Sequence, residues 1–456
     1  MPISKAYSTG NKPNEIVSVV DFGAVGDGVN DDTAAIQAAI DSITTAGAIY
    51  FPSGTYYCAS GLTVSSARIA LLGDGQLSSI IEFDDGATTG INISGSPTAG
   101  FLFKDLWIRT NNVSSSTHTL IKVRSNSNWT IENCSLGRSG TLLDIDGTYI
   151  GKVIGGQVNN CNQVLKMDDT VASTADILLT GITFGTIATG SDAVIDVASP
   201  GLSVVGCTIE TQNHTKTLLN AATGAQRVVW EGNKGEESGQ IVCGTSVEVV
   251  INGGQLFDCY DSSTLRTIRV DSGTKANVSG IQIKYTTSGT YNAINASGGL
   301  SANGVTIDGA LTGIQGGTGV ITGCYLVNNT TAINASGSEM VINPNYYSGN
   351  TTDVTRTVTE LTIVSGAITI GNGDFYIVDT ESNAATDDLE TINGGYPGKD
   401  ITLIAANSSR TVVCKDAIGN MNISGDFSLN QARDTVTLKK STDGTWIELS
   451  RSDNAS

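Results

Sequence analysis

Two glutamates occupy equivalent places in successive repeats of this 456-residue chain, and such a pair is suited to acid–base chemistry on a glycosidic bond. Glu210 and Glu236 each follow a glycine, Gly206 and Gly232, by four residues. Glycoside hydrolysis uses two carboxyl groups, about 5 to 5.5 Å apart for retention and roughly 6.5 to 9.5 Å apart for inversion. If the repeats stack, neighbouring or next-nearest repeats supply either separation, and both outcomes stay open.

Further ionisable and aromatic side chains fall in the same part of the sequence. Cations would contact polar groups of a glycan and aromatic rings would stack on its sugars. The alternative to a catalytic role is that the exposed carboxylates of this acidic protein only keep it soluble. The predicted catalytic residues are Glu210, Glu236, Glu231 and Asp258, and the predicted substrate-binding residues are Trp230, Lys234, Tyr260, Arg227 and Lys284.

Metal and cofactor chemistry has little support in the sequence. The chain has two histidines, His118 and His214, and no pair of cysteines with the spacing of a zinc site. We therefore expect no metal and no cofactor, and we expect both histidines in surface loops. Elimination at a uronate needs only a Lys or Arg base and a cation, so a lyase reaction with Arg266, Arg269 or Lys284 stays an alternative.

The repeat that positions these side chains is a short corner, in which an apolar and a polar residue precede Gly, Asn or Asp. These residue types tolerate the left-handed backbone conformation of a sharp bend. After each corner, residues alternate between inward and outward positions, as in a strand. The repeat near Trp230 is irregular because Asn233 and Gly235 take inward positions. The corners lie at Asp105, Asn133, Gly155, Gly181, Gly206, Gly232, Gly253, Gly280, Gly304 and Gly323.

Successive corners are 19 to 28 residues apart, a loose period that is typical of the stacked coils of a solenoid. A solenoid buries a continuous core over any length, whereas one compact core would not serve a chain of this size. Cys134, Cys207 and Cys324 share the inward position after a corner, so we expect them to pack in that core and not to form disulfides.

Composition excludes two classes of partner. The net charge of −19, from 25 Lys and Arg against 44 Asp and Glu, argues against binding a nucleic acid. No apolar run is long enough to insert into a membrane. The first residues lack the apolar core of a secretory signal, so an extracellular role would require release by lysis or another route.

The N-terminal stretch 21–41, DFGAVGDGVNDDTAAIQAAID, combines a Gly-rich turn with a helix that Asp31 or Asp32 would cap. The apolar stripe of this helix would close the open end of the solenoid. Together with AIYFPSGTYY at 48–57, the stretch resembles the opening of pectate-lyase-like right-handed parallel β-helix proteins, a superfamily that includes many phage tailspikes. In that family the Asp-rich turn is a structural cap, so no catalytic role passes to Asp27, Asp31 or Asp32.

Other motifs of the family set limits on the resemblance. The GHG and NTD segments of the polygalacturonases and the RxPxxR arrangement of the pectate lyases are missing, so the fold does not imply pectin chemistry. Residues 355–456 alternate short β runs with turns such as GNGD and STDG. They resemble the C-terminal β domains of phage receptor-binding proteins, where such domains commonly help three chains assemble.

We therefore predict an all-β fold, namely a right-handed single-stranded parallel β-helix with an N-terminal capping helix and a C-terminal antiparallel, sandwich-like β domain. Residues 1–15 are expected to form a short virion-attachment segment. The β-helix is expected over 16–350, with its cap in 16–60. Residues 351–456 are expected to serve trimerisation or receptor binding.

The resemblance implies a homotrimeric phage tailspike that recognises a host surface polysaccharide and depolymerises it by glycoside hydrolysis. It would be carried on the virion tail, contact phage tail or baseplate proteins through its N-terminus, and act at the host cell surface. The acidic charge favours a neutral or amino-sugar glycan over an acidic one. Alternatives are a non-catalytic receptor-binding adhesin, a polysaccharide lyase, and a monomeric secreted enzyme.

Overall fold

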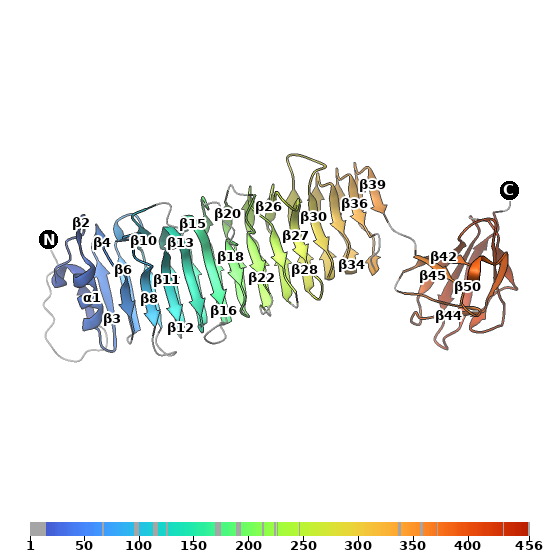
Figure 1. Ribbon diagram of the computed structural model, residues 1–456, viewed down its shortest axis with the longest axis horizontal. Helices are drawn as coiled ribbons and strands as arrows, with labels where there is room; N and C mark the ends of the chain where they lie inside the picture. Colours follow the sequence, from blue (N-terminus) through green and yellow to red (C-terminus); the bar gives the residue numbers. More distant parts are fainter. Residues whose placement is uncertain are drawn as a thin grey trace.

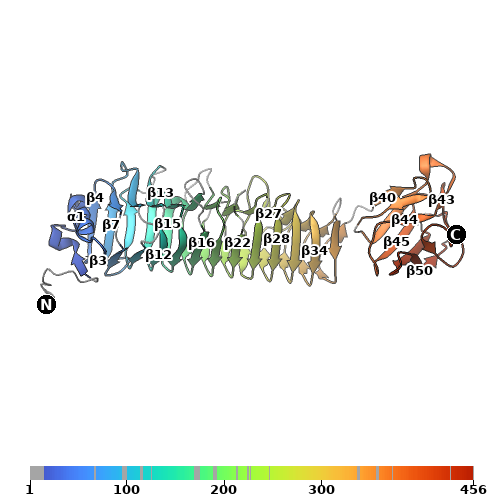
Figure 2. The same cartoon turned by 90° about the horizontal axis from the view of Figure 1, so that it is seen from below.

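Two β structures with separate hydrophobic cores make up the protein (Figure 1). The larger one is a parallel β-helix, as predicted, and the smaller one is a C-terminal β module that lies beyond its last coil (Figure 2). The computed structural model describes residues 15–65, 68–94, 100–112, 117–124, 126–168, 175–187, 193–211, 214–222, 225, 227–245, 247–335, 339–355, 359–371, 373–431 and 433–454. Residues 1–14, most of the expected virion-attachment segment, lie outside these ranges.

The first face of the β-helix is a 14-stranded sheet in which every neighbouring pair is parallel. Its strands are β1 (Glu15–Ser18), β3 (Ala46–Phe51), β6 (Arg68–Gly73), β9 (Phe101–Lys104), β12 (Ser127–Glu132), β14 (Tyr149–Ile154), β16 (Ala175–Thr180), β19 (Leu202–Val205), β22 (Arg227–Glu231), β25 (Glu248–Asn252), β28 (Lys275–Ser279), β31 (Gly299–Asn303), β34 (Thr318–Thr322) and β37 (Glu339–Ile342).

The other two faces form one 25-stranded sheet, because the long strands β13 and β15 run through both. The second face contains β2 (Asp27–Asp31), β4 (Gly54–Cys58), β7 (Ser79–Phe83), β10 (Trp107–Thr110), β13 (Ser135–Asp146), β15 (Gln157–Asp168), β17 (Thr183–Phe184), β20 (Thr208–Glu210), β23 (Lys234–Glu236), β26 (Gln255–Phe257), β29 (Gln282–Lys284), β32 (Thr306–Asp308), β35 (Tyr325–Val327) and β38 (Tyr346–Ser348). The third face adds β5 (Leu62–Val64), β8 (Thr89–Ser94), β11 (Thr119–Arg124), β18 (Ile195–Val197), β21 (Leu219–Ala221), β24 (Ile241–Cys243), β27 (Arg266–Val270), β30 (Asn292–Ala296), β33 (Thr312–Gln315), β36 (Thr331–Asn334) and β39 (Thr352–Thr355).

The predicted corners join the first face to the second. Asp105 and Asn133 have φ of 56° and 49°, and the corner glycines from Gly155 to Gly323 have φ between 60° and 64°. The peptide N–H of each corner residue extends the inter-strand hydrogen bonding around the bend, as Gly232 N donates to Asn252 O at 2.9 Å. Stacking the corners therefore places equivalent positions of successive coils in register along the helix.

Inward positions after the corners are buried, as the alternation predicts, and the irregular coil is explained by one side chain. Asn233 is buried, donates from Nδ2 to Val204 O at 2.8 Å and accepts from Cys207 N at Oδ1 at 2.8 Å. An asparagine is stable in this core because both of its polar atoms are paired. The cysteines are confirmed as core residues, since all eight are buried and free.

The N-terminal cap consists of a short 3₁₀ helix η1 (Val19–Phe22) and α1 (Thr33–Ser42), which lie over the first coil (Figure 1). Ile36, Ala39 and Ile40 bury one side of α1. The Asp32 carboxylate, itself buried, accepts from Val25 N at 2.6 Å and Gly26 N at 3.0 Å. This carboxylate therefore fixes the Gly-rich turn against the helix, which is a structural role.

The C-terminal module is only partly antiparallel, in contrast to the antiparallel sandwich predicted. Its first strands pair in parallel, as those of the β-helix do. Among the described residues, antiparallel strand pairs join β45 (Asp400–Ala405) to β49 (Thr435–Lys440), β46 (Thr411–Cys414) to β48 (Phe427–Leu429), and β49 to β50 (Trp446–Ser452). A short 3₁₀ helix, η2 (Glu381–Asn383), precedes β43. The strands are β40 (Thr359–Thr362), β41 (Ala367–Thr369), β42 (Phe375–Asp379), β43 (Thr386–Leu389), β44 (Thr391–Asn393), β45 (Asp400–Ala405), β46 (Thr411–Cys414), β47 (Met421–Asn422), β48 (Phe427–Leu429), β49 (Thr435–Lys440) and β50 (Trp446–Ser452).

One histidine differs from its predicted surface position. His118 is buried, and its Nδ1 lies 3.0 Å from Ser139 Oγ on the next coil. It lies in the connection directly before β11, but its side chain is buried and not on the surface. Among the described residues, no helix is long and apolar enough to cross a membrane.

Candidate functional site

Glu210 and Glu236 lie side by side on the outer surface of the second face. They end β20 and β23 and are register partners, so the structure brings them together as the corner spacing predicts. Glu210 is exposed and Glu236 is half-buried. Neighbouring parallel strands are about 4.8 Å apart, which places the two carboxylates within reach of one glycosidic bond.

Lys234 belongs to the same cluster. Lys234 and Glu236 project from the same side of β23, and Lys234 Nζ lies 2.7 Å from Glu236 Oε2. The hydrogen bond and the charge of Glu236 raise the pKa of Lys234, and the charge of Glu210 adds to this effect. A lysine and two carboxylates are thus grouped on two adjacent strands.

Lys284 continues the row of the glutamates. The register runs from Glu236 through Phe257 and Lys284 to Asp308 on successive strands. Lys284 Nζ lies 3.6 Å from Asp308 Oδ2, so this lysine is partly neutralised by its neighbour. It lies in line with the glutamates, but Phe257 separates it from them.

A hollow of about 510 Å³ lies beside this row, at the corner between the first and second faces. It exists because the corner residues carry no side chain, while the residues two positions later carry long polar ones. Lys234 belongs to its wall, so the hollow adjoins the carboxylate cluster. Its lining residues are Gly232, Asn233, Lys234, Gly254, Gln255, Gly280 and Gln282.

Gln255 and Gln282 line this hollow and are not among the predicted site residues. Gln255 Nε2 donates to Gln282 Oε1 at 2.9 Å across neighbouring strands. The same spacing rule that found the glutamates would have found them, because Gln255 stands two residues after Gly253 and Gln282 two residues after Gly280. Amide side chains in this position suit the hydroxyl groups of a sugar.

Two predicted aromatic contacts are wrong. Trp230 is fully buried, because it alternates with exposed Arg227 and Glu231 along β22 and so points into the core. Tyr260 is half-buried, but its ring is stacked on His214 at 4.1 Å and on Tyr291 at 3.8 Å, from coils on either side. With both of its faces covered, Tyr260 has no free face for a sugar ring.

The other predicted site residues either lie on the first face, on the far side of the corner from the two glutamates, or hydrogen-bond to the backbone of a turn. Arg227 and Glu231 are exposed on β22 of the first face, where Glu231 Oε1 lies 3.4 Å from Asn252 Nδ2. Asp258 has φ of 47°, and its carboxylate accepts from Thr286 N at 2.8 Å and Thr286 Oγ1 at 2.7 Å. Asp258 therefore fixes the adjoining turn, and its oxygens are engaged there.

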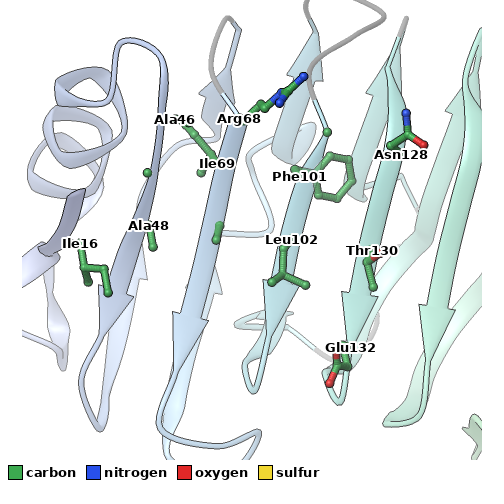
Figure 3. Close-up of a pocket in the computed structure, with 13 residues that line it drawn as sticks. Ile16, Ala46, Ala48, Arg68, Ile69, Phe101, Leu102, Asn128, Thr130 and Glu132 are labelled. Atoms are coloured by element: carbon green, nitrogen blue, oxygen red, sulfur yellow. The ribbon is translucent and has the colours of Figure 1, made fainter. Parts of the chain in front are cut away.

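A second and larger hollow, of about 840 Å³, lies on the first face near the N-terminal end (Figure 3). Ala48 and Ala70 are small, so a depression forms between Ile16 and Leu102. Arg68 and Asn128 lie at one end of it and Glu132 at the other. Glu132 is paired with Lys104 at 2.6 Å, so this hollow is an apolar surface without a carboxylate pair. Within the described part of the chain, no cluster of three or more His, Cys, Asp or Glu could hold a metal ion.

Comparison with known proteins agrees with the fold. Residues 16–120 match the family described as "Rhamnogalacturonase A/epimerase, pectate lyase-like". The N-terminal part of this parallel β-helix thus matches a pectate-lyase-like family, the resemblance that its N-terminal motif indicates.

Each of the relatives found by sequence matches about a fifth of the chain. Mannuronan C5-epimerase AlgE5 of Azotobacter vinelandii is 43% identical over 103 residues, which is 20% of this chain and 10% of the epimerase. Alginate lyase 7 of the same organism is 38% identical over 104 residues, 20% of this chain and 12% of the lyase. Plasmin and fibronectin-binding protein A of Streptococcus pneumoniae is 37% identical over 91 residues, which is 19% of this chain and 11% of that protein. The matches thus span about a tenth of the length of these relatives.

Solved structures are similar over more of the chain but at low identity. The catalytic unit of a GH87 alpha-1,3-glucanase from Streptomyces thermodiastaticus is 16% identical with a TM-score of 0.49, covering 75% of this chain and 70% of that one. The N-terminal fragment of bacteriophage Phi29 gene product 12 is 13% identical with a TM-score of 0.48, and the match covers 90% of this chain and 81% of the fragment. At these identities and TM-scores, the solved structures carry no argument about the fold or the function beyond the strand pairing of this chain.

Proposed function

We propose that this protein is a phage tailspike that binds a polysaccharide of the host surface and depolymerises it by glycoside hydrolysis. The observation that carries the proposal is the register of Glu210 with Glu236, beside the hollow at the corner. Two of the relatives by sequence are named as enzymes of the polysaccharides mannuronan and alginate, which is consistent with a glycan as substrate.

The surroundings of the two carboxylates divide their roles. Lys234 keeps Glu236 next to a positive charge, which suits a nucleophile, because a nucleophilic carboxylate reacts in its ionised form. Glu210 would then be the proton donor to the leaving oxygen. A strand separation of about 4.8 Å is close to the 5 to 5.5 Å of retaining enzymes, so Glu236 would form a glycosyl ester that water then hydrolyses, with Glu210 taking the proton.

The rest of the chain would serve assembly and attachment. In this proposal residues 1–15 attach to phage tail or baseplate proteins, and residues 351–456 hold three chains together or bind the receptor. The separate core of the C-terminal module is consistent with an independent role. The protein would belong to the virion tail and act at the host cell surface.

The test is depolymerisation of capsule and O-antigen preparations from bacterial hosts, read by mass spectrometry. Glu210→Gln and Glu236→Gln should each reduce the rate by about 10² or more, the usual contribution of a positioned acid or base. Glu248→Gln on the first face, which lies outside the cluster, should retain full activity. Unimpaired depolymerisation by the double variant would disprove the assignment.

An adhesin is the second candidate, and one relative favours it, since Plasmin and fibronectin-binding protein A is named for binding. The mass of the products separates the alternatives. Hydrolysis adds one water per cleaved bond, elimination leaves an unsaturated end, and an adhesin leaves the glycan intact. Sedimentation under native conditions distinguishes a trimeric spike from a monomeric secreted enzyme.

A further inference from the structure

Two tyrosines on neighbouring coils form an exposed aromatic pair near the C-terminal end of the β-helix. Tyr325 begins β35 and Tyr346 begins β38, and the two are register partners on the second face. Their side chains are 54% and 55% exposed, and their ring centroids are 5.4 Å apart at an interplanar angle of 40°. Single exposed aromatic residues are common on protein surfaces, but a contacting pair is a continuous apolar patch.

The pair continues the polar row that walls the hollow at the corner. The register leads from Lys234 through Gln255, Gln282 and Thr306 to Tyr325 on successive strands. Each of these residues holds the first position of its strand, and strands are about 4.8 Å apart. A polymer lying along the helix would therefore meet the amides first and the tyrosines a few sugar units further on.

The chemistry of this row selects one class of polymer. Glutamine amides and threonine hydroxyls both donate and accept hydrogen bonds, as sugar hydroxyls do. Tyrosine rings provide apolar area with a polar edge, which suits the mixed surface of a sugar ring. The one charged member, Lys234, is paired with Glu236, so the row offers little net charge to an anionic polymer.

The whole-chain charge points the same way. At −19, the protein repels an acidic polysaccharide at long range. A neutral glycan meets neither this repulsion nor an unpaired charge in the row. Uncharged hydrogen-bonding groups and apolar rings thus match an uncharged, hydroxyl-rich partner.

We propose that Tyr325 and Tyr346 form a binding subsite for a neutral glycan, which extends from this pair along the Gln282 and Gln255 row. This inference rests on the proposed glycan-binding function, and it identifies the substrate class and a subsite apart from the carboxylates. Binding at the tyrosines is independent of bond cleavage at Glu210 and Glu236.

The experiment is affinity electrophoresis of the full chain in gels that contain dextran, galactomannan or glucomannan as neutral probes, or alginate as the anionic probe. At least one neutral probe should retard the protein, and Tyr325→Ala with Tyr346→Ala should weaken that retardation at least tenfold. The Tyr325→Phe, Tyr346→Phe variant keeps both rings and should bind within about threefold of the parent. Tyr149→Ala, at an exposed tyrosine on the first face, is the matched control.

Circular dichroism of each variant establishes that it is folded. If the double Ala variant does not fold, the single variants Tyr325→Ala and Tyr346→Ala, each of which removes one ring, should each weaken the retardation. Retardation by alginate alone, by no probe, or equally before and after removal of both rings overturns the subsite. The Glu210→Gln, Glu236→Gln variant tests the catalytic pair separately from the tyrosines. If that variant also cleaves glycan normally while the tyrosine variant loses binding, the proposed catalytic pair fails and the subsite stands.

Discussion

His118 shows what a buried titratable side chain does to this protein at the scale of one residue. Burial lowers the pKa of His118 to about 4, against a smaller opposing effect of the Asp85 charge. In the unfolded chain a histidine has a pKa of about 6.5. The folded protein therefore binds this proton less readily than the unfolded chain does, and acid favours unfolding.

We expect the free energy of unfolding to fall by up to about 3 kcal/mol between pH 6.5 and pH 4 because of His118 alone. Carboxylates with a lowered pKa, such as Asp74, lose their stabilising charge only further down, below about pH 4. Urea denaturation at several pH values measures this slope. His118→Gln cannot titrate and should flatten the slope in that window, and an unchanged slope would show that His118 is not its source.

The candidate site could be predicted from the sequence only where residues belong to regular strands. Glu210 and Glu236 follow glycines by the same number of residues, and the stacked corners convert that spacing into register. The same alternation, applied to the strand before the corner, would have placed Trp230 in the core. Tyr260 lies in a connection without periodicity, so only the folded structure reveals that His214 and Tyr291 cover its ring.

At the scale of the element, the corner between the first and second faces sets the limits on substitution. Gly253 and Gly254 are adjacent and both have positive φ, 64° and 83°. A Cβ on Gly253 would meet nothing closer than Gly232 N at 4.0 Å, whereas a Cβ on Gly254 would lie 2.2 Å from Asn233 O. That oxygen accepts the hydrogen bond of Gln255 N, which joins two coils.

Gly253→Ala should therefore lower the free energy of unfolding only by the cost of holding alanine in the left-handed conformation, about 1 to 2 kcal/mol. Gly254→Ala should lower the free energy of unfolding clearly more. It adds to the same backbone strain a clash with Asn233 O, which cannot move without breaking the hydrogen bond between the two coils. Gly253→Asn should be milder than Gly253→Ala, since Asn tolerates this conformation. The free energy of unfolding of the three variants gives the ranking, and equal costs at both glycines would contradict the geometry.

The corners are also the reason why the β-helix was predictable as an element. Glycine, asparagine and aspartate are recognisable in the sequence, and from β19 onward the strand before each corner has four or five residues and the strand after it has three. The third face follows connections of variable length, with eight residues between Glu210 and Leu219 but four between Glu236 and Ile241, and no spacing rule locates its strands. The C-terminal module was predicted as β structure from its turns, but turns do not reveal whether strands pair in parallel.

At the scale of the whole molecule, the chain contains two independent cores. The core of the β-helix runs from Val19 to Met340, and that of the C-terminal module from Ile363 to Trp446. Each core has a fully buried tryptophan, Trp230 and Trp446 respectively. In the C-terminal module, Trp446 Nε1 also donates to Ile392 O at 3.1 Å.

Separate cores predict separate unfolding transitions in calorimetry. Trp446→Ala should destabilise the C-terminal module by about 3 to 5 kcal/mol and lower its transition by at least about 10 °C, because a module of this size shifts by about 4 to 8 °C per kcal/mol. The β-helix transition should stay in place. Trp230→Ala is the reciprocal variant, which should lower only the β-helix transition. A single transition that both variants shift together would show that the two structures unfold as one cooperative unit, and the independent role proposed for the module would lose its physical basis.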